Sequence, residues 1–296
     1  MSRFNCLLLF LQFLGVSQAY AQDSLASSLL WKISGQDIAE PSYLFGTIHI
    51  IPAEDYFLPK GTVESFKNSK TLFMELDLSG AGDFENMLPI MDKIFMENDT
   101  TLADLLTPEE YMTVSEYMEQ MGLPMMFFEK MKPMFLSAMA SPEMNPANLQ
   151  NGSVKSYEME FAEMAKSQNK NLKGLETVEF QLSLFDQIPY ATQAKLMVDA
   201  FKATDKQTGE LDKLVEIYKS QNLNLLQSAI EEGDDGLRPY MAILLNNRNR
   251  SWIPVMQKNM AQGSCFFAVG AGHLGGPNGI IKLLKELNYK VEPIAQ

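Results

Sequence analysis

The two histidines are the residues of this chain best suited to chemistry, because they share one local pattern. His49 ends the segment Gly46-Thr47-Ile48-His49, and His273 ends Gly270-Ala271-Gly272-His273, each directly after a short apolar run. Such runs predict buried strands, and strand ends are where α/β proteins place their chemistry. A neutral imidazole is the commonest metal ligand. The repetition therefore favours convergence of both side chains on one metal or substrate over the alternative that each only caps a turn.

An acidic pair lies within another apolar run. Glu75 is flanked by Met74 and Leu76, and Asp77 follows two residues later, on the same predicted face of a strand. A buried carboxylate is costly unless a cation meets it. Either the strand lies at a wet edge, or a metal, a protonated histidine or an arginine pairs with the acids. We expect Glu75 to act at the site, on a strand beside the one that leads to His49.

Three further charged residues are candidates for supporting roles. Glu176 ends a short strand pattern that precedes a helix, and Glu158 lies near the start of another predicted helix. Either could act as a general base. Arg248 is one of only four arginines in the chain. It could stabilise a developing oxyanion or clamp a carboxylate, or it could form a structural salt bridge.

Strand patterns at both ends of the chain enclose a helical middle. Strands are predicted at 29–33, 42–45, 71–77, 171–176, 266–269 and 289–294. Helices are predicted at 61–68, 84–96, 108–121, 156–168, 178–186, 191–201, 211–231, 238–260 and 279–287. We therefore expect an α/β fold (mixed α+β) in a single domain, residues 28–294. Its central sheet is built from N- and C-terminal strands and carries a large helical insertion at 84–260.

The clearest helix start lies in the predicted insertion. Thr107 is followed by Pro108 and, three residues after the threonine, by Glu110. This is the pattern of a capping box with proline at the first helical position. It predicts that a helix begins at Pro108.

The first 21 residues read as a cleavable secretory signal. An apolar stretch follows Arg3 and ends in Ala19-Tyr20-Ala21, a small-residue cleavage pattern. No later stretch approaches the roughly 20 apolar residues of a membrane helix. We expect a periplasmic or secreted protein without a transmembrane helix after cleavage. Cys265 would then be the one remaining cysteine, and we expect it to be inert inside an apolar strand.

Composition narrows the partners. The formal charge is −13, with no basic stripe that could neutralise phosphates, so a nucleic acid partner is excluded. A peptide or small-molecule substrate remains, and the oligomeric state is left open. Nine of the 20 methionines fall between Met112 and Met144. We interpret them mainly as core packing, with an adaptable groove for a flexible ligand and a soft-metal site as alternatives.

The motifs together resemble the TraB/GumN family, which includes the Tiki-type metalloproteases and is more distantly similar to erythromycin esterases and ChaN haem-binding proteins. The resemblance rests on five segments: Tyr43 to His49, Met74 to Asp77, Gly174 to Glu179, Arg248-Asn249 with Trp252, and Val269 to Leu274. It implies His49 and His273 as central site residues with Glu75 as their acidic partner. Glu158, Glu176 and Arg248 would be supporting residues, although Glu158 replaces the aspartate of many relatives. Gly46, Gly272 and Asn249 of the same motifs are expected to contact the substrate.

These observations predict a divalent-metal-dependent hydrolase, a peptidase or amidase. His49, His273 and Glu75 would hold Mn²⁺, Co²⁺ or Zn²⁺, and the methionine-rich helices would form the wall that receives the substrate. One alternative is a metal-free hydrolase of the erythromycin-esterase type, in which histidine and glutamate activate water. The other is a protein that binds a peptide or haem without turnover.

Overall fold

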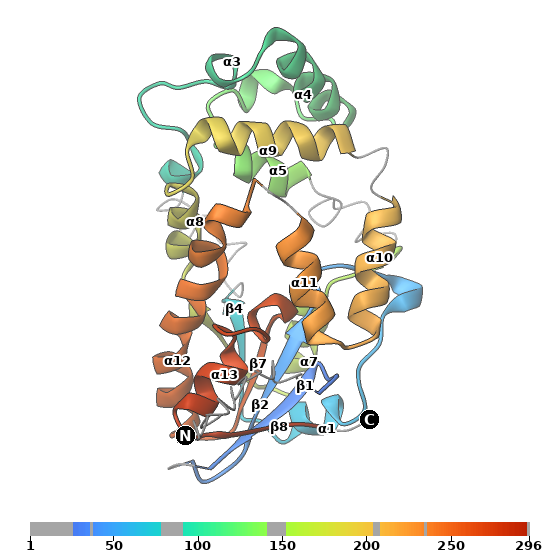
Figure 1. The fold of residues 1–296 in the computed structure, drawn as a ribbon, viewed down its shortest axis with the longest axis vertical. Helices are drawn as coiled ribbons and strands as arrows, with labels where there is room; N and C mark the ends of the chain where they lie inside the picture. The colour runs from blue at the N-terminus through green and yellow to red at the C-terminus, as the bar shows by residue number, and fades with distance from the viewer. Residues whose placement is uncertain are drawn as a thin grey trace, which may run out of the picture.

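The computed structural model describes residues 26–35, 38–77, 91–140, 152–203, 208–233 and 236–294. The predicted signal at 1–21 and most of the predicted helix at 84–96 lie outside these ranges. The strands are β1 (Leu30–Ser34), β2 (Ser42–Thr47), β3 (Ile51–Pro52), β4 (Thr71–Leu76), β5 (Val154–Lys155), β6 (Asn171–Glu176), β7 (Cys265–Gly270) and β8 (Lys290–Pro293). The predicted α/β fold, with strands from both ends of the chain in one sheet, is confirmed (Figure 1).

Eleven α-helices are described, together with short helical turns. They are α1 (Thr62–Lys67), α3 (Leu102–Leu105), α4 (Pro108–Gln120), α5 (Pro133–Ala140), α7 (Tyr157–Ser167), α8 (Val178–Phe185), α9 (Tyr190–Ala203), α10 (Thr208–Lys219), α11 (Leu223–Gly233), α12 (Asn247–Met260) and α13 (Ile280–Glu286). The turns are η1 (Ala53–Asp55), η2 (Asp92–Ile94), η3 (Met125–Phe127), η4 (Arg238–Tyr240), the π-helical η5 (Ala242–Asn246) and η6 (Ala271–His273). In the described part of the chain, no helix combines the length and hydropathy of a membrane span.

The main sheet has the strand order β6-β4-β7-β2-β1-β8. β6, β4, β7 and β2 run parallel, whereas β1 and β8 each pair antiparallel with their neighbours. A second small sheet joins β3 to β5. Parallel strands require crossover connections, and the helical middle of the chain supplies the long crossover from β4 through β6 to β7. All four parallel strands therefore end at the same edge of the sheet.

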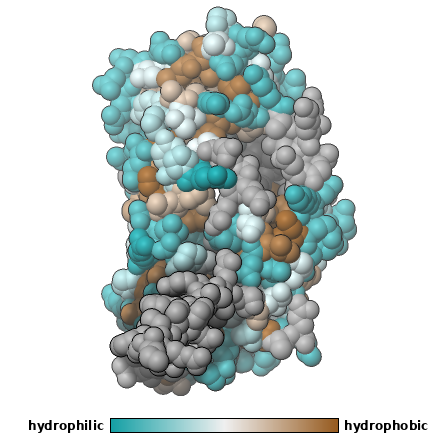
Figure 2. Space-filling view, in the orientation of Figure 1, coloured by the Kyte–Doolittle hydropathy of each residue, from teal (hydrophilic) through white to brown (hydrophobic). Residues whose placement is uncertain are grey.

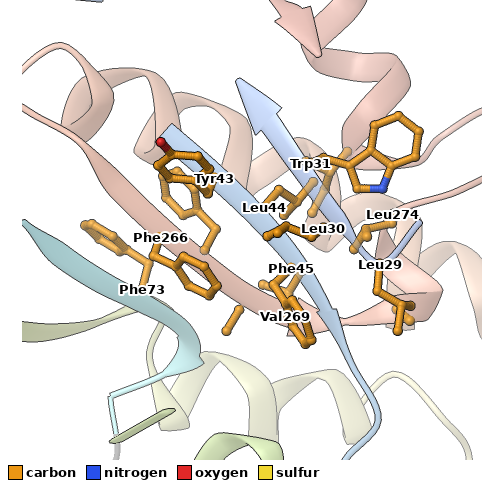
Figure 3. Packing of buried hydrophobic residues seen from close by; sticks show 14 of the residues in the cluster. Leu29, Leu30, Trp31, Tyr43, Leu44, Phe45, Phe73, Phe266, Val269 and Leu274 are labelled. Carbon is orange, nitrogen blue, oxygen red and sulfur yellow. The ribbon is translucent and has the colours of Figure 1, made fainter. Parts of the chain in front are cut away.

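Aromatic side chains hold the sheet between two helical layers. Phe266 of β7 contacts the rings of Phe66 of α1 and Phe161 of α7 at centroid distances of 5.2 and 5.1 Å. Its neighbour Phe267 points to the opposite face, where it contacts Phe73 of β4. Figure 3 shows part of this core, with β2 crossing it. Strands buried on both faces explain the continuous apolar runs of the sequence.

A second core lies in the helical layer formed by α3, α4, α5 and α9, which Figure 1 shows above the sheet. Met118, Met125 and Met131 are buried there, which confirms the packing interpretation for these methionines. The predicted helix start is also confirmed, because Glu110 N–H donates to Thr107 Oγ1 at 3.3 Å in a capping box. On the face shown in Figure 2, hydrophobic residues gather over these upper helices and beside α10 and α11.

Two predicted helices are divided in the structure. The helix expected at 211–231 breaks between α10 and α11, where Gln221 has a left-handed backbone (φ 56°) and Asn222 Oδ1 accepts the N–H groups of Asn224 and Leu225. The helix expected at 238–260 begins as a 3-10 turn and a π-helical turn before α12. Periodicity alone cannot detect these breaks, because the apolar pattern continues through them.

Candidate active site

The predicted site residues converge because parallel strands end at one edge of the sheet. Glu176 ends β6, Glu75 is the penultimate residue of β4, and His49 and His273 follow β2 and β7. The strand ends therefore bring these candidate residues to one side of the sheet. One detail of the prediction is wrong: β7 lies between β4 and β2, so the strand of Glu75 neighbours that of His273 and not that of His49.

Arg248 is the charged centre of the site. Its Nε donates to both Glu176 carboxylate oxygens at 3.0 and 3.1 Å, and its Nη2 donates to Glu176 Oε1 at 2.6 Å and to Glu75 Oε2 at 2.5 Å. Its Nη1 donates to the Leu244 carbonyl in the π-helical turn at 3.1 Å. Trp252 Nε1–H donates to Glu176 Oε2 at 2.9 Å. Glu176 is therefore saturated by donors, and it fixes the guanidinium in front of Glu75.

His273 is held as one neutral tautomer. Asn249 Nδ2 donates to the carbonyls of His273 and Asn278, so Asn249 Oδ1 is the acceptor that faces His273 Nδ1 at 2.6 Å. The proton therefore lies on Nδ1, and Nε2 keeps its lone pair. Arg248 Nη1 lies 3.2 Å from Nε2, and Glu75 Oε1 lies 3.6 Å from it. The imidazole consequently presents an acceptor nitrogen to the charged end of the site.

Burial and charge set the protonation states of this cluster. Burial would raise the pKa of Glu75, but the fields of His273 and Arg248 and the N–H of Gly270 outweigh it and hold that pKa at about 2. Burial lowers the pKa of His273 to about 4, although Glu75 acts in the opposite direction. Burial also opposes the charge of Arg248, but the two glutamates raise its pKa. At neutral pH, Glu75 is ionised and His273 is neutral.

His49 and Glu158 form a second polar group. His49 Nδ1 lies 3.3 Å from Glu158 Oε1, which also accepts the Thr47 hydroxyl at 2.9 Å. Ser156 Oγ, at the N-cap of α7, donates to Glu158 Oε2 at 3.1 Å. The His49 side chain is 65% exposed, compared with 22% for Glu158. These hydroxyl donors orient the Glu158 carboxylate toward His49.

Two of the motif glycines allow close packing. A Cβ on Gly46 would lie 3.0 Å from Ala271 Cβ and 3.0 Å from a Leu274 methyl, so the two histidine turns touch there. A Cβ on Gly272 would lie 2.7 Å from Ile230 Cδ1 of α11. Gly272 borders the cavity described next, whereas Gly46 and Asn249 do not. Asn249 instead accepts the His273 Nδ1–H and orients that ring. Substrate contact by Gly46, Gly272 and Asn249 stays a prediction.

A cavity of about 920 Å³ opens onto these polar groups. His49, Glu75, Glu158, Arg248 and His273 all border it, whereas Glu176 lies behind Arg248. A cavity with a few convergent polar groups and shifted pKa values is the usual form of an active site. The described methionine side chains between Met112 and Met134 do not border this cavity, whereas Ala138 of α5, in the same methionine-rich stretch, does. A substrate wall formed by the methionine-rich helices stays a prediction.

The donor chemistry suits a divalent metal, but only two of the three predicted ligands lie together. His273 Nε2 and Glu75 Oε1 are neighbours, and the hydrogen bond that His273 Nδ1–H donates to Asn249 Oδ1 gives His273 the tautomer that a metal requires. His49 instead pairs with Glu158, and Arg248 contacts the other two. Across the described ranges, no three His, Cys, Asp or Glu side chains are grouped closely enough to hold a metal ion. The set His49, His273 and Glu75 stays a prediction.

Several contributors escaped the sequence reasoning. Tyr218 of α10 borders the cavity, and its hydroxyl donates to the Gly46 carbonyl at 2.8 Å. Thr47 and the Gly270 N–H bind Glu158 and Glu75, respectively. Thr47 could have been found from its place inside the first histidine motif, whereas nothing near Tyr218 in the sequence signals its contact. Cys265 is buried with its pKa raised to about 11, so its thiol is neutral, as expected.

Comparison with known proteins places the chain in a family. A family model described as the TraB/PrgY/gumN family matches residues 29–293. The chain therefore belongs to this family, and the resemblance inferred from the motifs is confirmed. No solved structure matches the chain.

Curated relatives are similar over most of the chain. Metalloprotease TIKI1 of Danio rerio is 23% identical over 90% of this chain and 63% of its own length. Metalloprotease TIKI1 of Homo sapiens is 22% identical over 92% of this chain and 63% of its own length. Metalloprotease TIKI2 of Danio rerio is 22% identical, with 90% and 61% covered. The chain thus spans less than two thirds of the length of each relative.

Proposed function

We propose that this chain is a divalent-metal-dependent hydrolase that cleaves a peptide or related amide bond, in the periplasm or outside the cell. The single observation that carries the proposal is the convergence of Glu75 and neutral His273 at the charged end of the cavity. Similarity to proteins named metalloproteases supports a metal-dependent peptidase as the reaction class. The signal-like pattern in the first 21 residues supports the location.

The proposal assigns the metal to His273, Glu75 and His49. A bound Mn²⁺, Co²⁺ or Zn²⁺ would supply Lewis acidity and lower the pKa of a coordinated water. Asn249 holds the His273 proton on Nδ1, which leaves Nε2 available as a ligand. Gly270 N–H and Arg248 keep Glu75 ionised, as a carboxylate ligand must be.

The remaining residues move the proton and receive charge. Glu158 is the better placed general base, because it borders the cavity and is partly exposed, whereas Glu176 is fully engaged by Arg248 and Trp252. The Thr47 hydroxyl orients the Glu158 carboxylate, which would accept the proton of the attacking water. Arg248 borders the cavity and would stabilise negative charge that develops on the scissile carbonyl oxygen.

A metal-free hydrolase is the second candidate, and one observation favours it. Arg248 already supplies a cation to Glu75 and lies beside His273 Nε2, so the pair is electrostatically complete without a metal. In this arrangement His273 itself would be the acceptor for the proton of water. This enzyme would retain its activity after chelation. A binding protein would instead return its peptide intact, or show a Soret band with haem.

The deciding experiment is cleavage of a peptide library, read by mass spectrometry, with purified protein before and after chelation. Adding back Mn²⁺, Co²⁺ or Zn²⁺ separately should restore cleavage. Glu75→Gln should lower kcat/KM by about 100-fold or more, whereas Glu179→Gln, an exposed glutamate in the first turn of α8, should not. Cleavage that survives chelation would contradict metal dependence. Failure of every peptide and amide to be cleaved would contradict the hydrolase.

A further inference from the structure

Most of the surface that lines the cavity is apolar, and its charged groups gather where the parallel strands end. Glu75, Arg248 and His273 lie at that end, where the strands finish. His49, Glu158, Gln181 and Tyr218 add further polar atoms to the lining. The rest of the walls is mainly aliphatic and aromatic: Leu184, Phe185, Leu214, Leu226, Ile230 and Leu244. Fixed polar groups at one end and apolar walls beyond them indicate that orientation and affinity come from different parts of the ligand.

The apolar walls come from helices that surround the strand ends. α8 and the π-helical turn η5 provide Phe185 and Leu244, while α10 and α11 provide Leu214 and Ile230. The turn that carries His273 contacts α11 directly, because Gly272 has no side chain to hold Ile230 away. The same π-helical turn contacts Arg248 through the Leu244 carbonyl. The elements that form the apolar walls therefore contact the elements that carry the reactive groups.

The cavity is much larger than a single small side chain would fill. At about 920 Å³ it lies near the upper end of the range for drug-sized ligands, roughly 300–1,000 Å³. Water that fills such a space is released when apolar groups enter, which improves binding about fourfold for each methylene buried. The aliphatic and aromatic parts of the walls would leave a polar or charged substrate group without hydrogen-bond partners.

We propose, building on the hydrolase proposed above, that the substrate presents a bulky apolar group beside the scissile amide. The group is either a long aliphatic or aromatic side chain of a peptide or an acyl chain attached through an amide. The shared chemistry is a hydrocarbon chain that fills the helical walls while the amide lies at Glu75, Arg248 and His273. Small, polar or highly charged peptides are poor substrates.

The first test measures binding without turnover. Two series of ligands carry an E-alkene in place of the scissile amide, so that they cannot be hydrolysed. One series lengthens a peptide side chain from alanine to norleucine, and the other lengthens an acyl chain from acetyl to octanoyl. Calorimetry should show Kd falling about fourfold per methylene in at least one series, with an increasingly negative heat-capacity change. The series that responds identifies the source of the chain, and no response in either series overturns the proposal.

Two methionines provide a matched pair of variants. Met159 of α7 borders the cavity and is 55% exposed, whereas Met112 of α4 is 56% exposed and does not border it. Met159→Glu should weaken binding of the longest responsive ligand about tenfold or more and leave the shortest unchanged. Met112→Glu should change neither. Equal effects of the two substitutions, or none from Met159→Glu, would contradict an apolar site in this cavity.

The binding readout separates this inference from the proposed function. Tight binding of the long ligands, without cleavage of the corresponding amides, would support the apolar site and contradict the hydrolase. Cleavage of amides with no preference for chain length would support the hydrolase and overturn the apolar site.

Discussion

Replacing Arg248 with methionine tests the electrostatic account of the site. The Arg248 side chain is 8% exposed and lies within hydrogen-bonding distance of Glu75 and Glu176, whose side chains are 14% and 3% exposed. Methionine keeps most of the buried volume but removes the charge. Removing one partner of a buried ion pair costs about 3–5 kcal/mol, because the remaining charge is left uncompensated. Here two carboxylates lose one cation, so we expect a loss of unfolding free energy of about 4 kcal/mol.

Urea denaturation at neutral pH measures this loss. With an m-value of about 3 kcal/mol/M, the midpoint should fall by roughly 1.3 M. Arg250→Met is the matched control, because Arg250 lies in the same helix, is exposed, and donates to Asn278 Oδ1 at 2.7 Å. We expect the control to lose less than about 1 kcal/mol.

The pH dependence gives a sharper check of the same reasoning. In the wild type the Glu75 pKa is held below its ordinary value, so its contribution to stability is present above pH 4.5 and is lost as the pH falls toward about 2. Without Arg248, burial should raise the pKa of Glu75 above its value in the unfolded chain. Protonation of Glu75 should then remove the cost of burying an uncompensated negative charge. The deficit of Arg248→Met should therefore be largest at neutral pH and smaller near pH 4. A deficit equal to that of Arg250→Met, or independent of pH, would refute the reasoning.

Three further predictions concern stability. Asn249→Ala should cost about 2–3 kcal/mol in urea denaturation, because it leaves the buried His273 Nδ1–H without its acceptor; a cost below about 0.5 kcal/mol would contradict this bond. Thr107→Ala should cost about 1 kcal/mol through loss of the capping box, and Thr107→Ser should restore most of it. Wild-type stability should fall by up to about 3 kcal/mol between pH 6.5 and 4, because the His273 pKa is lowered to about 4 and protons bind the unfolded chain first. His273→Asn should remove that dependence, and an unchanged profile would show that His273 does not cause it.

The site was more predictable from the sequence than its surroundings. Glu75, Glu176 and His273 could be assigned because each follows or ends an apolar strand, and parallel strands bring their ends together. Arg248 could be singled out because arginine is rare in this chain. The sequence alone did not decide whether it stabilises an oxyanion, clamps a carboxylate or forms a structural salt bridge. The structure pairs it with both glutamates.

The strand order, the helix breaks and the cavity walls depend on tertiary contacts that leave no local pattern in the sequence. The predicted neighbour of the Glu75 strand was wrong, because β7, which lies between β4 and β2, comes from a distant part of the sequence. The break at Gln221 and the π-helical turn before Arg248 interrupt apolar patterns that continue through them. The apolar walls come from separate helices such as α8 and α11, so no single segment reveals the cavity.

The most direct test of the account is elemental analysis of protein purified without chelator or affinity metal. We predict about one equivalent of Mn, Co or Zn in the wild type. It should be lost in His273→Ala, Glu75→Gln and His49→Ala, and retained in the exposed-glutamate control Glu179→Gln. Absence of metal in the wild type, with no uptake of added Mn²⁺, Co²⁺ or Zn²⁺, would contradict the metal-dependent hydrolase and leave the chemistry to His273, Glu75 and Arg248 alone.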